Sequence, residues 1–331
     1  MKLASFQNHR GETLVGLKVG DSLADLSAAF EKYLVEERGV LPQSAVEAAC
    51  VRMPSSMLAL IQREEEGQAD LRDVAAFVDK AAKGREVMYA PSGARITYGL
   101  HEVRLLKPIP QLRRCFNIGV NYPVFEKMMG IMGPEENKTC MFMVTPESTI
   151  GPDEVIEWPQ SAEEVCTELE LGVIIGKKGK RIAQSNALDY VFGYTVVNDV
   201  TGMDIIAKGL GTGREGVPGM YYVTRAKSFD SFQPMGPYIV LKDEIGDPQG
   251  VVGELRINGE AKIKGNTKDM RCSVRRLIEY LSEDITFYPG DLLSSGGMGS
   301  EQFSPHAFVK RGDVVEAELD KIGVLRSYVQ R

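Results

Sequence analysis

The chain has 331 residues, of which 43% are hydrophobic and 26% are charged, and its formal net charge is −7. This composition is typical of a soluble globular protein that is long enough to bury a sizeable core. The negative balance argues against nucleic acid as the main partner, because contacts to phosphates need clustered Lys and Arg.

We find neither a transmembrane segment nor a secretory signal in the sequence. No window approaches the roughly 18 consecutive apolar residues of a spanning helix, and MKLASFQNHRGETL is too poor in apolar residues for a secretory signal. Five cysteines without a CxxC pair suit a reducing compartment and do not indicate a zinc ribbon. We therefore expect a cytoplasmic protein without membrane or nucleic-acid partners.

The first 105 residues predict a small α+β domain. MKLASF and LVGLKV are typical of short strands, and Ser22 is a candidate cap for a helix through ADLSAAFEKYLVEE. The run SSMLALIQREEEGQADLRDVAAFVDKAAK predicts a second helical region, with a break expected at Gly67. Two prolines in Leu106–Pro110 favour an extended connector. We predict two domains, 1–105 and 106–331.

Beyond this connector, short β-like runs separated by Gly and Pro predominate, and SVRRLIEYLSE is the one strong helical pattern among them. Many short strands with few helices favour a closed or rolled sheet over alternating βαβ units. The predicted fold class is α+β, mostly β. The glycine-rich stretch Gly209–Gly216 contains GxGxxG, but Pro218 follows and no helical pattern opens after it, so we interpret it as a loop.

Two carboxylates interrupt an apolar run in CTELELGVII. Side chains alternate along a strand, so Glu168 and Glu170 are expected on the same face. In a dry site their charges would repel each other unless a cation lay between them, and hard divalent ions prefer oxygen ligands. Asp199, at the end of YVFGYTVVND, supplies a third carboxylate. The alternative is that both glutamates line the solvent face of an edge strand.

Six blocks carry a wider resemblance. They are CTELELGVIIGKKGKRI, ALDYVFGYTVVNDVTGMD, AKSFDSFQPMGPYIV, INGEAKIKGNTKDM, ITFYPGDLLSSGGMGS and KRGDVVEAELDKIGVL. In this order they resemble the fumarylacetoacetate hydrolase family, from about Leu106 to the C-terminus, and the N-terminal part is similar to the small leading domain of many bacterial members. The resemblance implies a mixed β-sheet roll and a homodimer.

The resemblance also implies a site. It assigns Mg²⁺, or Mn²⁺ or Ca²⁺, to Glu168, Glu170 and Asp199, and the family's active-site lysine corresponds to Lys227. A metal with open positions can chelate a 1,3-dicarbonyl or 2-oxo acid, and a nearby ammonium would stabilise the enolate that forms when a bond breaks. Hydrolysis of a carbon-carbon bond, decarboxylation and isomerisation all share this enolate.

One expected part of the site is missing. Family hydrolases carry a His-Glu dyad in a pattern like NYxxHxxE, which activates water. This chain has Phe125 and Met128 at those two positions, so Glu126 is the candidate for a displaced carboxylate base. The three histidines, His9, His101 and His306, are each expected to be surface or structural residues.

The substrate-binding residues also depart from the family pattern. The candidates are Asn121, Tyr122, Ser295, Gly296 and Gly297. Gly297 stands where the family has a Thr, and Met203 stands where it has an Arg. The metal ligands are kept while the substrate surroundings have changed.

From this pattern we expect a metal-dependent hydrolase that cleaves a carbon-carbon bond of an acylpyruvate or another β-dicarbonyl compound, as in the catabolism of aromatic compounds. The first alternative is a decarboxylase or isomerase of a 2-oxo dicarboxylic acid, which can act without the dyad. The second is a catalytically silent relative that binds a ligand.

Overall fold

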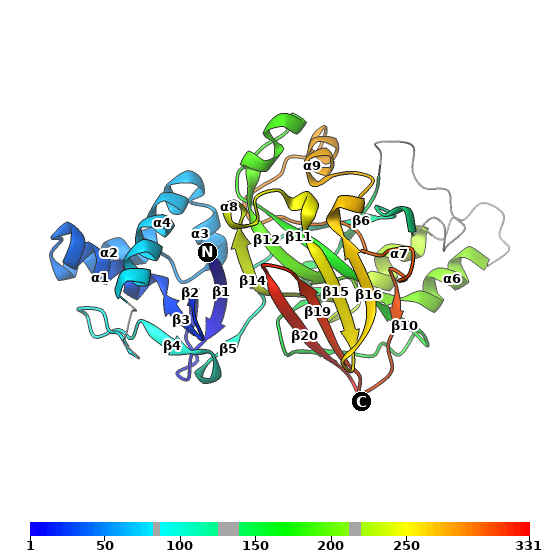
Figure 1. The fold of residues 1–331 in the computed structure, drawn as a ribbon, viewed down its shortest axis with the longest axis horizontal. Helices are drawn as coiled ribbons and strands as arrows, with labels where there is room; N and C mark the ends of the chain where they lie inside the picture. The colour runs from blue at the N-terminus through cyan, green and yellow to red at the C-terminus, as the bar shows by residue number, and fades with distance from the viewer. Residues whose placement is uncertain (82–86, 125–138, 212–219) are drawn as a thin grey trace.

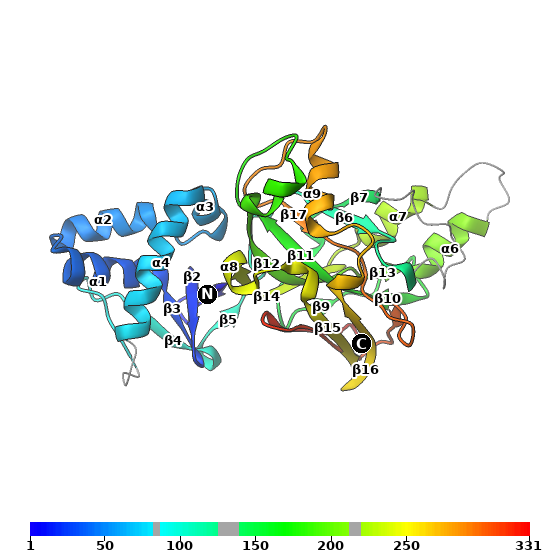
Figure 2. The ribbon, with the colours of Figure 1, turned by 45° about the horizontal axis from the view of Figure 1, so that its top comes forward.

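The computed structural model describes residues 1–81, 87–124, 139–211 and 220–331. Figure 1 shows two parts side by side: an N-terminal part in which helices pack against short strands, and a larger part built mainly of strands. The larger part carries few helices, and they lie at its margins (Figure 2). The described residues therefore have the α+β, mostly β composition that the sequence predicts.

One large sheet runs through both parts. In order across the sheet its strands are β4 (Thr97–Gly99), β3 (Ser22–Asp25), β2 (Thr13–Val19), β1 (Lys2–Gln7), β14 (Gln233–Leu241), β12 (Val191–Asn198), β11 (Leu169–Ile175), β17 (Leu292–Ser294), β6 (Cys115–Gly119) and β7 (Cys140–Val144). Two short strands lie beside it: β5 (Arg104–Leu105) pairs with β1, and β8 (Thr149–Ile150) pairs with β14.

Two smaller sheets complete the larger part. The first contains, in order, β16 (Glu260–Asn266), β15 (Val252–Ile257), β19 (Val314–Leu319), β20 (Gly323–Val329) and β9 (Val155–Ile156). The second contains β13 (Thr201–Gly202), β10 (Val165–Thr167) and β18 (Ala307–Phe308).

The helices divide between the two parts. The α-helices are α1 (Leu26–Arg38), α2 (Pro42–Arg52), α3 (Met57–Ile61), α4 (Glu64–Ala81), α6 (Met203–Gly211), α7 (Met220–Lys227), α8 (Lys242–Ile245) and α9 (Val274–Ser282). Short 3₁₀ helices are η1 (Leu100–Glu102), η2 (Pro146–Ser148), η3 (Gln184–Tyr190), η4 (Pro248–Gly250) and η5 (Thr267–Asp269). Among the helices described, we find none with the length and apolarity needed to span a bilayer.

Two local predictions for the N-terminal part are wrong. Ser22 opens strand β3, and helix α1 is capped by Asp25, whose carboxylate accepts a hydrogen bond from the Ser27 amide. Gly67 lies inside α4, and the break falls earlier, between α3 and α4. A Cβ at Gly67 would lie 2.8 Å from the Cβ of Arg63. Glycine therefore lets the first turn of α4 lie close to the residues that connect it to α3.

The glycine-rich stretch is also partly different from the prediction. Residues 209–211 form the end of helix α6, so they are not a loop. Residues 212–216 lie outside the described part of the chain.

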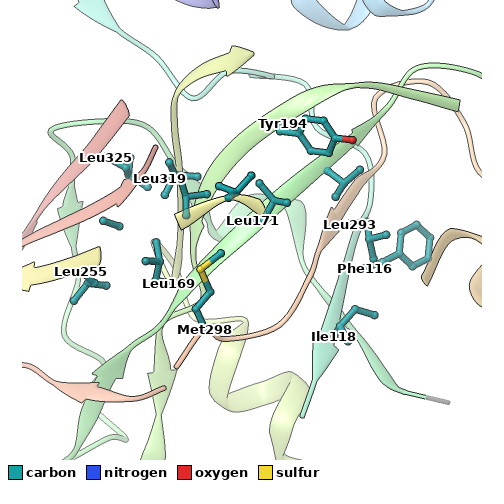
Figure 3. Packing of buried hydrophobic residues seen from close by; sticks show 14 of the residues in the cluster. Phe116, Ile118, Leu169, Leu171, Tyr194, Leu255, Leu293, Met298, Leu319 and Leu325 are labelled. Atoms are coloured by element: carbon teal, nitrogen blue, oxygen red, sulfur yellow. The ribbon is translucent and has the colours of Figure 1, made fainter. Parts of the chain in front are cut away.

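The central core lies between the main sheet and the five-stranded sheet. All seven residues of β11 are buried, and Figure 3 shows Leu169 and Leu171 of this strand near Leu255 of β15 and Leu319 of β19. Burial of each such side chain is worth about 1.5–3 kcal/mol. The packed faces hold β11 and β12 in one position, and the candidate site lies at their ends.

The N-terminal part is joined to the larger part by strand pairing. Strand β1 pairs antiparallel with β14, with Lys2 opposite Val240, so the N-terminal strands extend the main sheet. One hydrophobic cluster contains residues of both parts, including Leu3 and Ile239. The division at residue 105 remains a prediction.

Candidate metal centre

Three buried carboxylates meet where β11 and β12 pair. Glu168 lies between β10 and β11, Glu170 is on β11, and Asp199 directly follows β12. The register places Leu169 opposite Asn198 at this end of the pair. The exposed fractions of the three residues are 3%, 0% and 1%, which contradicts the alternative that the glutamates line a solvent face. One ligand oxygen from each carboxylate lies within 4.8 Å of the others.

Lys227 joins two of these carboxylates. Its Nζ donates to Glu168 Oε1 and to Asp199 Oδ2, each at 2.8 Å. The hydroxyl of Thr201 also donates to Glu168 Oε1, at 3.1 Å. Lys227 is the last residue of helix α7 and is 7% exposed, so it is a buried partner of the site and not a surface lysine.

Glu170 is held by hydrogen bonds from β17 and the loop that follows it. Glu170 Oε2 accepts hydrogen bonds from Ser294 Oγ at 2.5 Å and from the Gly296 amide at 2.9 Å. Among the residues that the structure describes, none donates a hydrogen bond to the other oxygen of Glu170, Oε1, or to Asp199 Oδ1. Donors in the described part of the chain thus fix one oxygen of each carboxylate and leave Glu170 Oε1 and Asp199 Oδ1 as buried acceptors without a donor.

The charges at the site do not balance. Burial raises the pKa of Glu170 well above its ordinary value, and the charges of Asp199 and Glu168 raise it further. Burial also raises the pKa of Asp199 to about 6, against the effect of Lys227. For Glu168 burial acts upward, but the charges of Lys227 and His306 outweigh it and bring the pKa to about 2. One lysine therefore does not compensate all three carboxylates.

The residues present fit a hard divalent cation. Burying an ionised carboxylate without an opposite charge costs several kcal/mol of folding free energy, and a bound cation would offset this cost. An all-oxygen donor set suits Mg²⁺, Mn²⁺ or Ca²⁺. Lys227 is held as an ammonium, because burial lowers its pKa less than the charges of Asp199, Glu168 and Glu170 raise it. Glu168, Glu170 and Asp199 are the residues that would hold the ion.

The stabilisation by Mn²⁺ is expected to increase with pH. A carboxyl with a raised pKa stabilises the metal-free fold at low pH, and this contribution is lost as the pH rises through about 6 for Asp199. The loss amounts to about 2–3 kcal/mol for a shift of this size. Mn²⁺ binds the ionised form, so the rise in melting temperature on adding Mn²⁺ should be small near pH 5 and several degrees larger near pH 8. Thermal unfolding with and without Mn²⁺ measures it, and an increment independent of pH would contradict the charge assignment.

His306 also reaches the centre. Its Nε2 lies 3.2 Å from Glu168 Oε1, and its side chain is 8% exposed. It precedes β18, which pairs antiparallel with β10 so that Ala307 is opposite Thr167. The sequence predicts a surface or structural histidine here, and it misses this contact because the pairing joins segments about 140 residues apart.

The carboxylates lie in a part of the chain that resembles a known protein family. The sequence profile described as fumarylacetoacetate (FAA) hydrolase C-terminal matches residues 114–330. The chain belongs to the fumarylacetoacetate hydrolase family. The match covers the strands and loops that carry all of the carboxylates above, as the resemblance of the six sequence blocks implies.

Two curated relatives in this family have different activities. The mitochondrial oxaloacetate tautomerase of Homo sapiens is 37% identical over 228 residues, 68% of this chain and 68% of its own length. The 2,4-didehydro-3-deoxy-L-rhamnonate hydrolase of Sphingomonas sp. is 35% identical over 252 residues, 75% of this chain and 82% of its own length. The chain is thus an enzyme of a family whose members include tautomerases and hydrolases.

A solved structure supports the fold. The maleylpyruvate hydrolase of Sphingobium sp. SYK-6, in complex with manganese(II) and pyruvate, aligns with a TM-score of 0.66 at 23% identity, over 100% of this chain and 99% of its own. The predicted fold of the fumarylacetoacetate hydrolase family, with its mixed sheets, is confirmed.

The side chain of Asn121 is hydrogen-bonded to the backbone of two other segments. Its Nδ2 donates to the carbonyl oxygens of Cys272 and Ser295, at 3.0 and 2.8 Å, and its Oδ1 accepts from the Cys272 amide. Both amide hydrogens are therefore used within the protein. These bonds hold the loop after β17, and a contact between Asn121 and substrate stays a prediction.

Other predicted substrate-binding residues keep unsatisfied polar atoms. The hydroxyls of Tyr122 and Ser295 are buried and find no hydrogen-bond partner within the described ranges. Burial raises the pKa of Tyr122 well above its usual range, and the charge of Glu170 adds to this, so the phenol stays protonated. Tyr122 also lines an open pocket of about 750 Å³.

The two glycines after Ser295 lie against the carboxylates. Gly296 has φ +100, a conformation that favours glycine, and its amide donates to Glu170. At Gly297 a Cβ would lie 2.5 Å from Glu168 Oε2. The family pattern has a Thr at this position. In this chain Glu168 occupies the space that the side chain of a Thr would take.

Replacing Gly297 with Ala is therefore expected to displace the Glu168 carboxylate, because three neighbouring groups hold its other oxygen and limit its freedom. We expect Mn²⁺ affinity to fall about tenfold, an effect like that of disturbing an outer-sphere partner. Calorimetric titration measures it. Gly250→Ala is the matched control, since a Cβ added at Gly250 would meet no atom within 4 Å. Equal affinity of both variants would contradict the packing argument.

The predicted base Glu126 lies outside the described residues, as do Phe125 and Met128. The structure therefore leaves the role of Glu126 as a prediction. The sequence has Phe125 and Met128 at the two positions where the resemblance to the family places the His and Glu of the dyad.

Proposed function

We propose that the protein is a divalent-metal-dependent enzyme that interconverts the keto and enol forms of a 2-oxo acid. One observation carries the proposal: among the described residues, one buried carboxylate oxygen of Glu170 and one of Asp199 have no hydrogen-bond donor, and the ammonium of Lys227 lies between Glu168 and Asp199. This arrangement would supply a cation site and a positive charge within one buried cluster of side chains.

A divalent ion held by Glu168, Glu170 and Asp199 would supply Lewis-acid chemistry to the oxygens of a 2-oxo acid. Lys227 contributes the second positive charge. Its ammonium is fixed by two carboxylates at 2.8 Å, so it needs little reorganisation when negative charge develops on the oxygen of an enolate. The ring of Phe142, 5.6 Å from Nζ, further limits the lysine to this position.

The proposal favours isomerisation over hydrolysis for a chemical reason. Moving a proton between carbon and oxygen needs stabilisation of the enolate but no activated water, whereas hydrolysis needs a base for water. The chain lacks the His-Glu dyad that supplies this base in family hydrolases, because Phe125 and Met128 replace it. The tautomerase activity of the human relative supports the same assignment.

The second candidate is hydrolysis of a carbon-carbon bond in an acylpyruvate or β-dicarbonyl compound. It is favoured by the Sphingomonas relative, a hydrolase that covers 75% of this chain. Decarboxylation of a 2-oxo dicarboxylic acid shares the same enolate and forms a third outcome. Mg²⁺ as the ion, a homodimer, a cytoplasmic location and a place in the catabolism of aromatic compounds remain proposals.

Incubation with Mg²⁺ and a panel of 2-oxo acids in D₂O distinguishes these reactions. A tautomerase should consume the enol of oxaloacetate and exchange the C3 protons of substrate without producing fragments. Two acid fragments from an acylpyruvate would instead favour the hydrolase, and CO₂ with pyruvate from oxaloacetate the decarboxylase. Absence of exchange and of fragments across the panel would contradict the proposed function.

A further inference from the structure

A second group of metal-ligating side chains overlaps the carboxylate centre. Ligand atoms of Cys166, Glu168 and His306 all lie within 4.8 Å of one another. Cys166 is on β10 and His306 immediately precedes β18. The antiparallel register pairs Thr167 with Ala307, so continuing it by one step places His306 beside Glu168.

The two groups differ in their chemistry. Glu168, Glu170 and Asp199 offer only carboxylate oxygens, which suit hard ions. Cys166, Glu168 and His306 offer a thiolate, a carboxylate and an imidazole, and this set suits Zn²⁺ and Co²⁺. Three protein ligands with one open position make a tetrahedral site of the kind that binds zinc.

We propose that Cys166, Glu168 and His306 form a second metal site, selective for Zn²⁺-like ions, that shares Glu168 with the hard-ion site.

The spacing of the ligands permits this. A tetrahedral zinc ion with bonds of about 2.0–2.3 Å places two of its ligands about 3.3–3.8 Å apart, so ligand atoms that lie within 4.8 Å of one another need to approach by at most about 1–1.5 Å. His306 Nε2 and Glu168 Oε1 are already 3.2 Å apart. The thiol proton of Cys166 leaves to solvent when the ion binds. Cys166 is fully buried, so thiolate, carboxylate and imidazole replace the water around the ion.

The shared ligand makes the two sites compete. Lys227 Nζ already lies 2.8 Å from Glu168 Oε1, so two divalent ions and an ammonium would crowd one carboxylate. A Zn²⁺-like ion in the second site therefore excludes the hard ion. Zinc would act as an inhibitor of the proposed metal-dependent activity, and this consequence alone rests on the proposed function.

Titration of the full chain with Co²⁺ tests the site without any assay of activity. A thiolate ligand gives Co²⁺ a strong charge-transfer absorption in the near ultraviolet, which an all-oxygen site lacks. We expect this absorption in the wild type, its loss in Cys166→Ser, and a loss of affinity of about tenfold or more in His306→Gln. Cys50→Ser, which changes an exposed cysteine, is the control and should retain the absorption.

Competition completes the test. Zn²⁺ should displace Mn²⁺ from the wild type, measured as release of free Mn²⁺ by electron paramagnetic resonance, and should do so at least about tenfold less effectively in Cys166→Ser. Absence of the charge-transfer absorption in the wild type at saturation, or its persistence in Cys166→Ser, overturns the proposal. The wild-type spectrum decides the matter even if Cys166→Ser fails to fold.

Discussion

Replacing Glu170 with Gln is expected to lower the affinity for Mn²⁺ about 100-fold or more. The substitution keeps the shape of the side chain and its acceptor for Ser294 and Gly296, but it removes one of three buried charges. Loss of an outer-sphere partner of a metal ligand already costs about 10–100-fold in affinity, so loss of a direct ligand should cost more. Calorimetric titration of the metal-free protein with Mn²⁺ measures the effect.

The same variant should be more stable than the wild type when no metal is present. In the metal-free protein Glu170 repels Asp199 and Glu168, and burial raises its pKa. A neutral amide relieves this repulsion, and we expect the melting temperature at pH 8 to rise by about 2 °C or more. Glu164→Gln, at an exposed position nearby, is the control and should change neither quantity. If Glu170→Gln binds Mn²⁺ with unchanged affinity, the assignment of Glu170 as a metal ligand is contradicted.

Replacing Lys227 with Met is expected to reduce turnover about 100–1,000-fold, the usual cost of removing one preorganised group that stabilises a developing oxyanion. Mn²⁺ should still bind, and more tightly, because the substitution removes a positive charge that lies 2.8 Å from Glu168 and Asp199. The two effects have opposite signs, so a variant that is merely misfolded cannot produce both. Steady-state rates of enol consumption and Mn²⁺ titration measure them.

Lys264→Met is the matched control for this prediction. Lys264 is half-exposed and pairs with Glu254 on the five-stranded sheet, so its replacement should leave rate and metal affinity unchanged. If Lys227→Met retains the wild-type rate, the ammonium has no part in the chemistry, and the role of Lys227 is limited to its contacts with the carboxylates.

The strands and the positions of the clustered carboxylates could be predicted because their signals are local. Alternation in ELELGVII and the apolar run before Asp199 are visible in short windows, and the structure places both runs in the main sheet. The prediction of one continuous strand was too simple, since the chain leaves β10 at Thr167 and enters β11 at Leu169. Glu168 lies at this junction, where its backbone amide donates to the Asn198 side chain.

The remaining parts of the site depend on contacts between distant segments. His306 meets Glu168 only because β18 pairs with β10, and no short window of sequence encodes that pairing. Asn121 has the same residue type whether it faces a substrate or holds the backbone at Cys272. The one available signal for His306 is its position just before the apolar pair Ala307 and Phe308, a weak pattern for an edge strand.

A crystal structure of the protein with Mn²⁺ and oxalate, an analogue of the enolate of pyruvate, tests the central claim most directly. The account predicts one anomalous scattering peak in contact with Glu168, Glu170 and Asp199, and oxalate bound to that ion with an oxygen facing Lys227. An absence of manganese between the three carboxylates, or oxalate bound away from Lys227, would contradict it.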